Sequence, residues 1–327
     1  MDKFNAIVIR ENNNELNFKR EMIDLSSLSE GNVIVHVNYS SLNYKDMLGF
    51  QLNGGVIKNY PMIPGIDFSG EVVQSDDPDF VVGDEVVLTG YDVGMAHTGG
   101  FSEYARVPGK WLVHIPATMS MRETMVYGTA GFTAALAVDR LQRMGMNNPK
   151  ARILIAGVTG GVGSVALAIL KNLGYENITG MVHNGEREQI ARDFGADHVI
   201  TSSRLDKDQK PLTSAKYDFA IDAVGGEVTS QILPAMAYDG IVAITGNAGG
   251  NQLFTTVLPF ILRAVSLVGI DSVSVDMETR NRVWNLLARE WDVTTNLRVD
   301  EISMDQISEV VNKIKDGQHI GRTIVKM

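Results

Sequence analysis

The stretch RILIAGVTGGVGSVALAIL, residues 152–170, joins a short apolar run to a longer one through a glycine-rich turn. The first run predicts a β-strand, and the second predicts a helix that begins in the turn. The three glycines at 157, 160 and 163 have the spacing GxxGxxG, a variant of the fingerprint in which bare backbone and a helix N-terminus approach a pyrophosphate. A tight turn without a ligand is the alternative. The residues predicted to bind a dinucleotide are Gly157, Thr159, Gly160, Gly161, Val162 and Gly163.

Strand-like and helix-like patterns alternate on both sides of this turn, and most of the strand-like runs are almost entirely apolar. That pattern is typical of a parallel sheet whose two faces are both covered by helices. We therefore expect an α/β domain of the Rossmann type, with a doubly wound parallel sheet, over residues 124–270. Its six strands are expected at residues 152–157, 177–182, 197–200, 217–224, 240–246 and 264–270.

The residues before this domain form short β-branched runs separated by Gly, Pro, Asn and Asp, which is typical of a small antiparallel barrel or sandwich. The residues after it contain two helical patterns and end in the strand-like GRTIVKM. We expect this tail to return to the first domain, so that residues 1–123 and 271–327 form one discontinuous domain. A chain of 327 residues is long enough for two domains.

The composition excludes several classes of protein. The net charge is −10 without a cluster of Lys and Arg, which argues against a nucleic-acid partner. The chain has no cysteine, so it has neither disulfides nor thiol chemistry. Its most apolar stretches are short or interrupted, so we expect no membrane span, and we see no signal peptide at the N-terminus. A cytoplasmic protein with a small-molecule substrate is the expectation.

The residues after the second strand of the nucleotide domain bear on the choice of dinucleotide. An NAD-binding chain carries an acidic residue there, which bonds the ribose hydroxyls. This chain instead has His183 and Asn184 at the strand end, followed by Arg187 and Arg192, which suits the extra phosphate of NADPH. We therefore expect NADPH, with His183, Asn184 and Arg187 as contacts. Glu186 and Glu188 lie close enough to keep NADH as the alternative.

Two other strand ends are expected to lie near the nicotinamide. Ligands of open α/β sheets bind at the carboxyl ends of the strands. The fourth and fifth predicted strands end in DAVGG, residues 222–226, and TGNAGG, residues 245–250. The residues expected to line the nicotinamide side are Val224, Gly246 and Asn247.

A second stretch, SSLNYKDMLGF at residues 40–50, places Tyr44, Lys45 and Asp46 side by side after a strand-like pattern. One interpretation is the edge of an active site, where Tyr44 donates a proton, Asn43 donates a hydrogen bond to a carbonyl, and Asp46 orients its neighbours. A phenol with an ordinary pKa of about 10 remains a donor at neutral pH. The alternative is a surface ion pair between Lys45 and Asp46, which contributes little to stability.

Several longer motifs resemble those of medium-chain dehydrogenases/reductases. They are SSLNYKDMLG, PMIPGIDFSGEVV, VGDEVVLTGYDVGMAHTGGFSEYARV, GTAGFTAAL, GVTGGVGSVA, LPFILRAVSLVGIDSV and GRTIVK. The chain is most similar to the zinc-free, quinone oxidoreductase-like branch, and within it to the acryloyl-CoA reductases that use NADPH. The resemblance implies a GroES-like barrel for the discontinuous domain. It also implies a homodimer that pairs through the edge of the Rossmann sheet at residues 264–270.

The resemblance further implies a site without metal. Zinc-dependent relatives have a cysteine in the loop where this chain reads NYKD, and a His-Glu pair where it has Ile66 and Asp67. They also carry a lobe with four cysteines, and this chain has none. A zinc site needs three or four converging ligands. We therefore expect no bound metal and a reaction that does not depend on zinc.

Reduction of an activated C=C bond suits such a site. The resemblance implies reduction of a short 2-enoyl-CoA, acryloyl-CoA to propanoyl-CoA, with hydride passing from NADPH to the β-carbon. It also implies that Tyr44 contacts the nicotinamide end of the cofactor, and that Ser272 and Arg322 reach the cofactor from the returning segment. A reductase of quinones or small enones is one alternative. A non-catalytic, NADPH-binding sensor is another.

Overall fold

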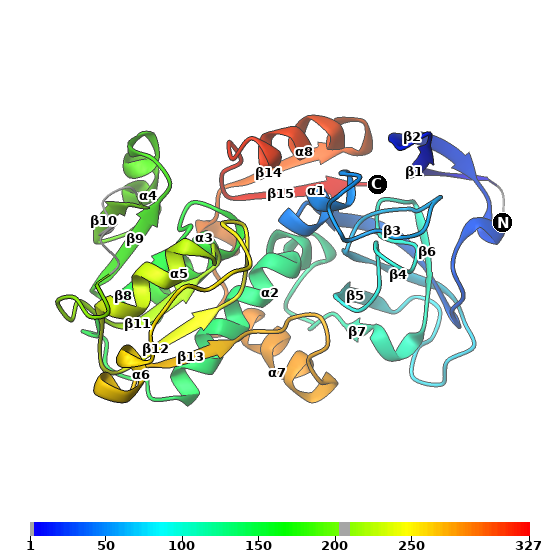
Figure 1. Ribbon diagram of the computed structural model, residues 1–327. Coiled ribbons are helices and arrows are strands. Elements are labelled where there is room, and N and C mark those ends of the chain that lie inside the picture. The colour runs from blue at the N-terminus through cyan, green and yellow to red at the C-terminus, as the bar shows by residue number, and fades with distance from the viewer. Residues whose placement is uncertain (1–2, 203–209) are drawn as a thin grey trace. The chain divides into compact units, whose positions relative to one another are not determined.

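A computed structural model of the protein describes residues 3–202 and 210–327 (Figure 1). The chain divides into two compact units. Unit 1 comprises Met1–Thr129, Ser272–Arg289 and Arg298–Met327, and unit 2 comprises Ala130–Asp271 and Glu290–Leu297.

The division differs in two places from the domain boundaries predicted from the sequence. Helix α2 (Met121–Arg143) runs through the first boundary, and its backbone is non-helical at Gly128, so the division falls at this kink. The segment Glu290–Leu297 belongs to unit 2, where the side chain of Asn172 donates a hydrogen bond to the carbonyl of Glu290 at 2.8 Å.

Unit 2 contains a six-stranded parallel sheet with the order β10-β9-β8-β11-β12-β13. The chain enters this sheet at the central strand β8 and adds β9 and β10 on one side. It then adds β11, β12 and β13 on the other side, so the strand order reverses between β8 and β11. All six predicted strands are present. They are β8 (Ile153–Ala156), β9 (Ile178–Val182), β10 (His198–Thr201), β11 (Tyr217–Asp222), β12 (Met236–Ile244) and β13 (Ser266–Gly269).

The helices of unit 2 bury an apolar face against this sheet. In the helix after the glycine turn, Val165, Leu167 and Ile169 are fully buried, as expected for a helix packed on a strand layer. The helices, besides the second part of α2, are α3 (Gly161–Asn172), α4 (Glu188–Asp193), α5 (Glu227–Ile232) and α6 (Leu258–Arg263).

Unit 1 contains a seven-stranded sheet with the order β14-β15-β3-β4-β5-β7, in which β6 also pairs with β3, and a separate hairpin of β1 and β2. Every pair is antiparallel except β14 with β15. The strands are β1 (Phe4–Asn12), β2 (Glu15–Ile23), β3 (Val33–Ser41), β4 (Asp67–Ser75), β5 (Glu85–Thr89), β6 (Tyr104–Val107), β7 (Val113–His114), β14 (Val299–Ser303) and β15 (Arg322–Lys326).

The tail of the chain returns to unit 1, as predicted from GRTIVKM. Strand β15 lies antiparallel to β3, with Val325 opposite Ser40. Two strands, β2 and β14, were not predicted. Most of their residues are exposed or half-buried, so neither strand shows the apolar alternation by which a buried strand is recognised.

The helices of unit 1 are the first part of α2, α1 (Tyr44–Gly49), α7 (Met277–Leu287) and α8 (Ile307–Lys315). Ile307 and Val310 of α8 share an apolar core with Met47 of α1, so α8 supports the short helix that begins at Tyr44. Within the two ranges that the structure describes, no helix is both long and apolar enough to cross a membrane.

Candidate active site

The helix that begins at Tyr44 is capped by its own acidic residue. Asn43 precedes the helix in an extended conformation, and its backbone N–H donates to the Asp46 carboxylate at 2.9 Å. The other oxygen of Asp46 accepts from the backbone N–H of Ile66, also at 2.9 Å. Asp46 is only 2% exposed, so the alternative of a surface ion pair with Lys45 is wrong for this residue. The carboxylate instead joins α1 to the segment before β4.

Asp67, the first residue of β4, lies at the centre of a buried polar group. It is fully buried, and its carboxylate accepts from the backbone N–H and the hydroxyl of Ser41. It also accepts from the side-chain amide of Asn43 at 2.9 Å and from the backbone N–H of Thr129 at 2.7 Å. Four donors from three segments therefore satisfy one buried charge. We call Ser41, Asn43, Asp46, Asp67, Thr129 and Arg322 the Asp67 cluster.

Arg322, at the start of β15, supplies the positive charge of this cluster. Its guanidinium donates to the carbonyl of Val126 and to the hydroxyl of Ser41, both at 2.9 Å. Longer contacts of 3.4 Å reach the carbonyl of Leu42 and the side-chain oxygen of Asn43. The residue is 1% exposed, and its guanidinium nitrogens are directed at acceptors within unit 1. This geometry favours a role inside the cluster over the expected contact with the cofactor.

The kink of α2 at Gly128 makes room for the cluster. Gly128 has a φ of 52°, a conformation that costs glycine little. A Cβ at this position would lie 2.3 Å from the Ser41 hydroxyl and 2.6 Å from a guanidinium nitrogen of Arg322. The break also directs the N–H of Thr129 to Asp67 and the carbonyl of Val126 to Arg322, instead of to other turns of the helix.

Asp46 is the member of the cluster that titrates near neutrality. Burial, together with the negative charge of Asp67, raises the pKa of Asp46 from 3.8 to about 7. The hydrogen bonds from Ile66 and Asn43 act in the opposite direction but are outweighed. Burial lowers the pKa of Arg322, and the charges of Asp67 and Asp46 partly offset that effect. With Asp46 protonated, the charges of Arg322 and Asp67 cancel.

Tyr44 is the exposed residue in this otherwise buried stretch. Its side chain is 41% exposed, whereas Leu42, Asn43, Asp46 and Met47 are each at most 7% exposed. The phenol therefore lies on a helix whose N-terminus is fixed by buried residues. Of the three residues predicted to be catalytic, only Tyr44 presents its side chain to solvent, while Asn43 and Asp46 hold the loop that carries it.

The glycine turn of unit 2 has the geometry that a pyrophosphate needs. Gly157 has a φ of 71°, and a Cβ on Gly163 would lie 2.3 Å from the Gly157 carbonyl oxygen, so neither position accepts a larger residue without strain. Helix α3 begins at Gly161, and the first N–H groups of a helix have no partner within it. Among the described residues, the buried hydroxyl of Ser164 has no hydrogen-bond partner. These donors fit the phosphates of a dinucleotide.

Arg187 lies beside this turn. Its guanidinium donates to the Thr159 hydroxyl at 3.1 Å, so the segment after β9 reaches back to the glycine turn. His183 and Asn184 follow β9 and are exposed, as residues that meet a ligand at a strand end would be. The structure thus brings the residues predicted for the adenosine end together within unit 2. Arg192, by contrast, is exposed in the last turn of α4.

The loops that follow β11 and β12, the two other predicted strand ends, lie in close backbone contact. Asp222, which is fully buried, accepts from the N–H groups of Val224 and Gly225 and from the hydroxyl of Thr229. A Cβ on Gly246 would lie 2.4 Å from the carbonyl oxygen of Ala223, so the loops after β11 and β12 pack directly on each other. Val224 and Gly246 are half-buried and Asn247 is exposed at this carboxyl edge of the sheet.

Ser272 belongs to unit 1 and is tied there by Arg280, a residue that sequence reasoning missed. Arg280 is fully buried and donates to Thr89 at 2.7 and 2.8 Å and to the carbonyls of Ser272 and Val273. Its guanidinium also lies 4.8 Å from the centre of the Tyr91 ring. The signal was the helical spacing of α7, which puts Arg280 on the same face as the buried Val283, Trp284 and Leu287.

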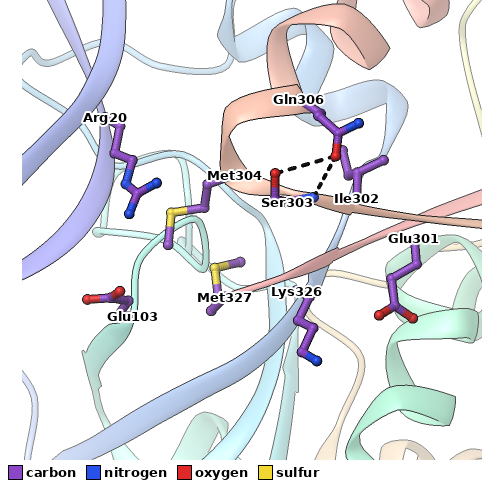
Figure 2. A pocket seen from close by; sticks show the side chains of 9 residues that line it. All are labelled: Arg20, Glu103, Glu301, Ile302, Ser303, Met304, Gln306, Lys326 and Met327. Atoms are coloured by element: carbon purple, nitrogen blue, oxygen red, sulfur yellow. Dashed lines mark hydrogen bonds between the residues drawn. The ribbon is translucent and has the colours of Figure 1, made fainter.

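A separate cavity of about 340 Å³ opens in unit 1, and no predicted site residue lines it (Figure 2). Its walls come from β2, β14, β15 and the segment that precedes β6. Figure 2 shows positive, negative and apolar side chains around it. The lining residues are Arg20, Glu103, Glu301, Ile302, Ser303, Met304, Gln306, Lys326 and Met327.

Two family models match the chain. Residues 29–117 match the alcohol dehydrogenase GroES-like domain, and residues 161–289 match the zinc-binding dehydrogenase model. A relative in Escherichia coli, described as a probable acrylyl-CoA reductase AcuI, is 41% identical over 98% of this chain and 99% of its own length. The acrylyl-CoA reductase AcuI of Ruegeria pomeroyi is 39% identical over 98% of both chains. The chain belongs to the medium-chain dehydrogenase/reductase family, in its quinone oxidoreductase-like branch. It is an oxidoreductase.

Solved structures of relatives share the fold over their full length. The YhdH protein of E. coli K-12, solved with bound NADPH, is 40% identical with a TM-score of 0.94 over 98% of this chain and 99% of its own. The yhfP protein of Bacillus subtilis, solved with NAD bound, is 39% identical with a TM-score of 0.95 over the whole of both chains. These comparisons confirm a GroES-like domain joined to a Rossmann domain.

The residues of this chain do not fit the zinc that one family model names. The chain has no cysteine, and within residues 3–202 and 210–327 no three His, Asp or Glu side chains lie close enough together to hold a metal ion. The buried carboxylates of Asp46 and Asp67 are already taken by N–H and O–H donors, and the cation beside them is the guanidinium of Arg322. These residues therefore do not form a zinc site.

The raised pKa of Asp46 predicts a pH-dependent stability. A carboxyl that binds its proton more tightly in the folded state stabilises the fold fully below its unfolded pKa of 3.8, and this contribution is lost as pH rises through about 7. The free energy of unfolding, measured in urea between about pH 5 and about pH 8, should fall by on the order of a few kcal/mol more in the wild type than in Asp46→Asn. Parallel pH profiles for the two proteins would contradict the assignment.

Proposed function

We propose that this protein reduces the C=C bond of short 2-enoyl-CoA thioesters, acryloyl-CoA foremost, with NADPH as the reductant. Hydride adds to the β-carbon, electron density moves to the thioester oxygen, and the α-carbon then takes a proton. The products are propanoyl-CoA and NADP⁺. The names of the two AcuI relatives, at 39 and 41% identity over nearly the whole chain, support this substrate class.

One observation carries the proposal: Tyr44 offers an exposed phenol from a helix whose cap is buried and fully hydrogen-bonded. The enolate that forms during the reduction needs a hydrogen-bond donor held in place before the reaction begins. The O–H of a phenol can donate to the enolate oxygen or deliver the proton. Tyr44 fills this role without a metal.

NADPH is supported by the glycine turn together with Arg187. The turn offers backbone N–H groups to the pyrophosphate, and a guanidinium beside it suits the phosphate on the adenosine ribose. The YhdH protein solved with NADPH is 40% identical to this chain. When bound, NADPH supplies the hydride.

A reductase of quinones or small enones is the second candidate. It is favoured by YhfP of B. subtilis, which carries quinone oxidoreductase as a provisional name and is 39% identical over 99% of this chain. The same protein was solved with NAD, which also keeps NADH in consideration.

The decisive assay is the rate of NADPH oxidation with acryloyl-CoA, beside the same assay with a benzoquinone. We expect turnover with the thioester and a loss of roughly 100-fold or more in kcat for Tyr44→Phe, because the enolate loses its donor. Tyr238→Phe is the matched control, since this tyrosine is 72% exposed in β12 of unit 2. Turnover with the quinone alone would favour the second candidate. Tight NADPH binding without any turnover would indicate a sensor.

Cofactor choice should depend on Arg187. We expect Arg187→Ser to weaken NADPH binding by roughly 10- to 100-fold and to leave NADH binding almost unchanged, because only NADPH carries the ribose phosphate. Titration of protein fluorescence with each cofactor measures both constants. Arg192→Ser is the control, because that arginine is exposed on α4. Equal losses for the two cofactors would contradict the role of Arg187.

We also propose that the protein forms a homodimer through the β13 edge of unit 2. Strand β13 ends the sheet; its Leu267 and Val268 are half-buried, and the neighbouring segment carries exposed apolar side chains. Ile261 on α6 is 68% exposed, and Val257 just before it is 66% exposed. An unpaired edge beside apolar surface favours pairing with a second copy.

Light scattering after size-exclusion chromatography tests the dimer. We expect twice the mass of the chain for the wild type and a shift toward the monomer for Ile261→Asp, because a charge at the interface must lose its water. Val82→Asp is the control, since Val82 is a similarly exposed apolar residue of unit 1. A monomeric wild type, or an equal effect of both substitutions, would overturn the proposal.

A further inference from the structure

The side-chain amide of Asn43 lies between groups of opposite charge. Its oxygen faces a guanidinium nitrogen of Arg322 at 3.4 Å. Its nitrogen donates to Asp67 at 2.9 Å and to Asp46 at 3.1 Å. An amide turned by 180° would place its NH₂ against a cation and its oxygen against two carboxylates. The charges therefore permit one orientation of Asn43.

We propose that Arg322 and Asp67 are positioning residues for Tyr44, and that they act through Asn43. Asn43 is the N-cap of the helix whose first residue is Tyr44, so an amide fixed on both sides also fixes the direction in which that helix leaves β3. The proposal rests on the role of Tyr44 in the proposed reductase. Through Asn43, Arg322 on the last strand of unit 1 would thus influence the position of the exposed phenol.

The titration of Asp46 makes this arrangement measurable, so the groups that surround its carboxyl matter. Its uncharged contacts are N–H groups of Asn43 and Ile66, and the charged groups that act on it are Asp67 and Arg322. Lys45 is its neighbour on α1. Helix α8 turns apolar residues such as Ile307 toward α1, while its charged Glu309 and Lys313 pair with each other on the exposed side.

The ionised and protonated forms of Asp46 cap the helix differently. An ionised carboxylate accepts every N–H directed at it, whereas a protonated one meets donors on each side and must give up at least one bond. The orientation of Tyr44 should therefore change as Asp46 titrates, with a midpoint at about pH 7. Removal of the negative charge of Asp67 lowers this midpoint. Removal of the positive charge of Arg322 raises it.

NMR of the free protein with ring-¹³C-labelled tyrosine tests the proposal. The Tyr44 signal is identified by its loss in Tyr44→Phe. We expect its pH midpoint to move down by about one pH unit in Asp67→Asn and up by a similar amount in Arg322→Gln. Arg122→Gln removes an exposed cation of the same unit and should leave the midpoint in place. General destabilisation would not move the midpoint in opposite directions.

Two further variants keep the test decisive. Arg322→Lys keeps the charge but loses the planar fork, so it should retain the midpoint and shift the Tyr44 signal, even if Arg322→Gln fails to fold. In turnover assays Asp67→Asn should lower kcat roughly 10- to 100-fold and leave KM for NADPH unchanged.

A Tyr44 signal without a titration near pH 7, or midpoints that move in the same direction in both charge variants, would overturn the proposal. Full activity of Tyr44→Phe would instead contradict the role of Tyr44 in the proposed reductase, on which this proposal rests, and leave the NMR result standing.

Discussion

A buried carboxylate must find a donor for each of its oxygens, and in unit 1 this requirement falls on Asp67. The donors come from the end of β3, from the cap of α1 and from the kink of α2. Leaving such a group without partners would cost several kcal/mol, so the three segments are held together by one charge. Gly128 and Arg322 follow from the same requirement, because the first leaves space and the second balances the charge.

The same arrangement separates the residues that hold the site from the residue that faces solvent. Asn43, Asp46 and Arg322 are buried and hydrogen-bonded, and they leave Tyr44 as the exposed group. In the proposed reductase, the phenol of Tyr44 takes the place of the metal that a zinc enzyme would use as the electrophile. Unit 2 follows a similar rule, because the buried Asp222 holds the strand-end loops and the exposed Asn247 lies beyond them.

The sequence predicted the parts of the fold that are governed by local pattern. All six strands of unit 2 were found from apolar runs, and the return of the tail was found from GRTIVKM. Strands β2 and β14 were missed because their residues are mostly exposed. The resemblance implied that Arg322 reaches the cofactor, and no local pattern reveals that Ser41, Val126 and Arg322, far apart in the chain, come together. Burial of this kind depends on tertiary contacts, which a single sequence does not show.

The most direct test of the proposed reaction is to measure where the hydride of NADPH appears in the product. The enzyme would be given acryloyl-CoA with NADPH that carries deuterium at both positions of nicotinamide C4, and the product would be analysed by NMR and mass spectrometry. The account predicts propanoyl-CoA with one deuterium on the β-carbon and a hydrogen from water on the α-carbon. Deuterium on the α-carbon, or a reduced product without deuterium, would contradict it.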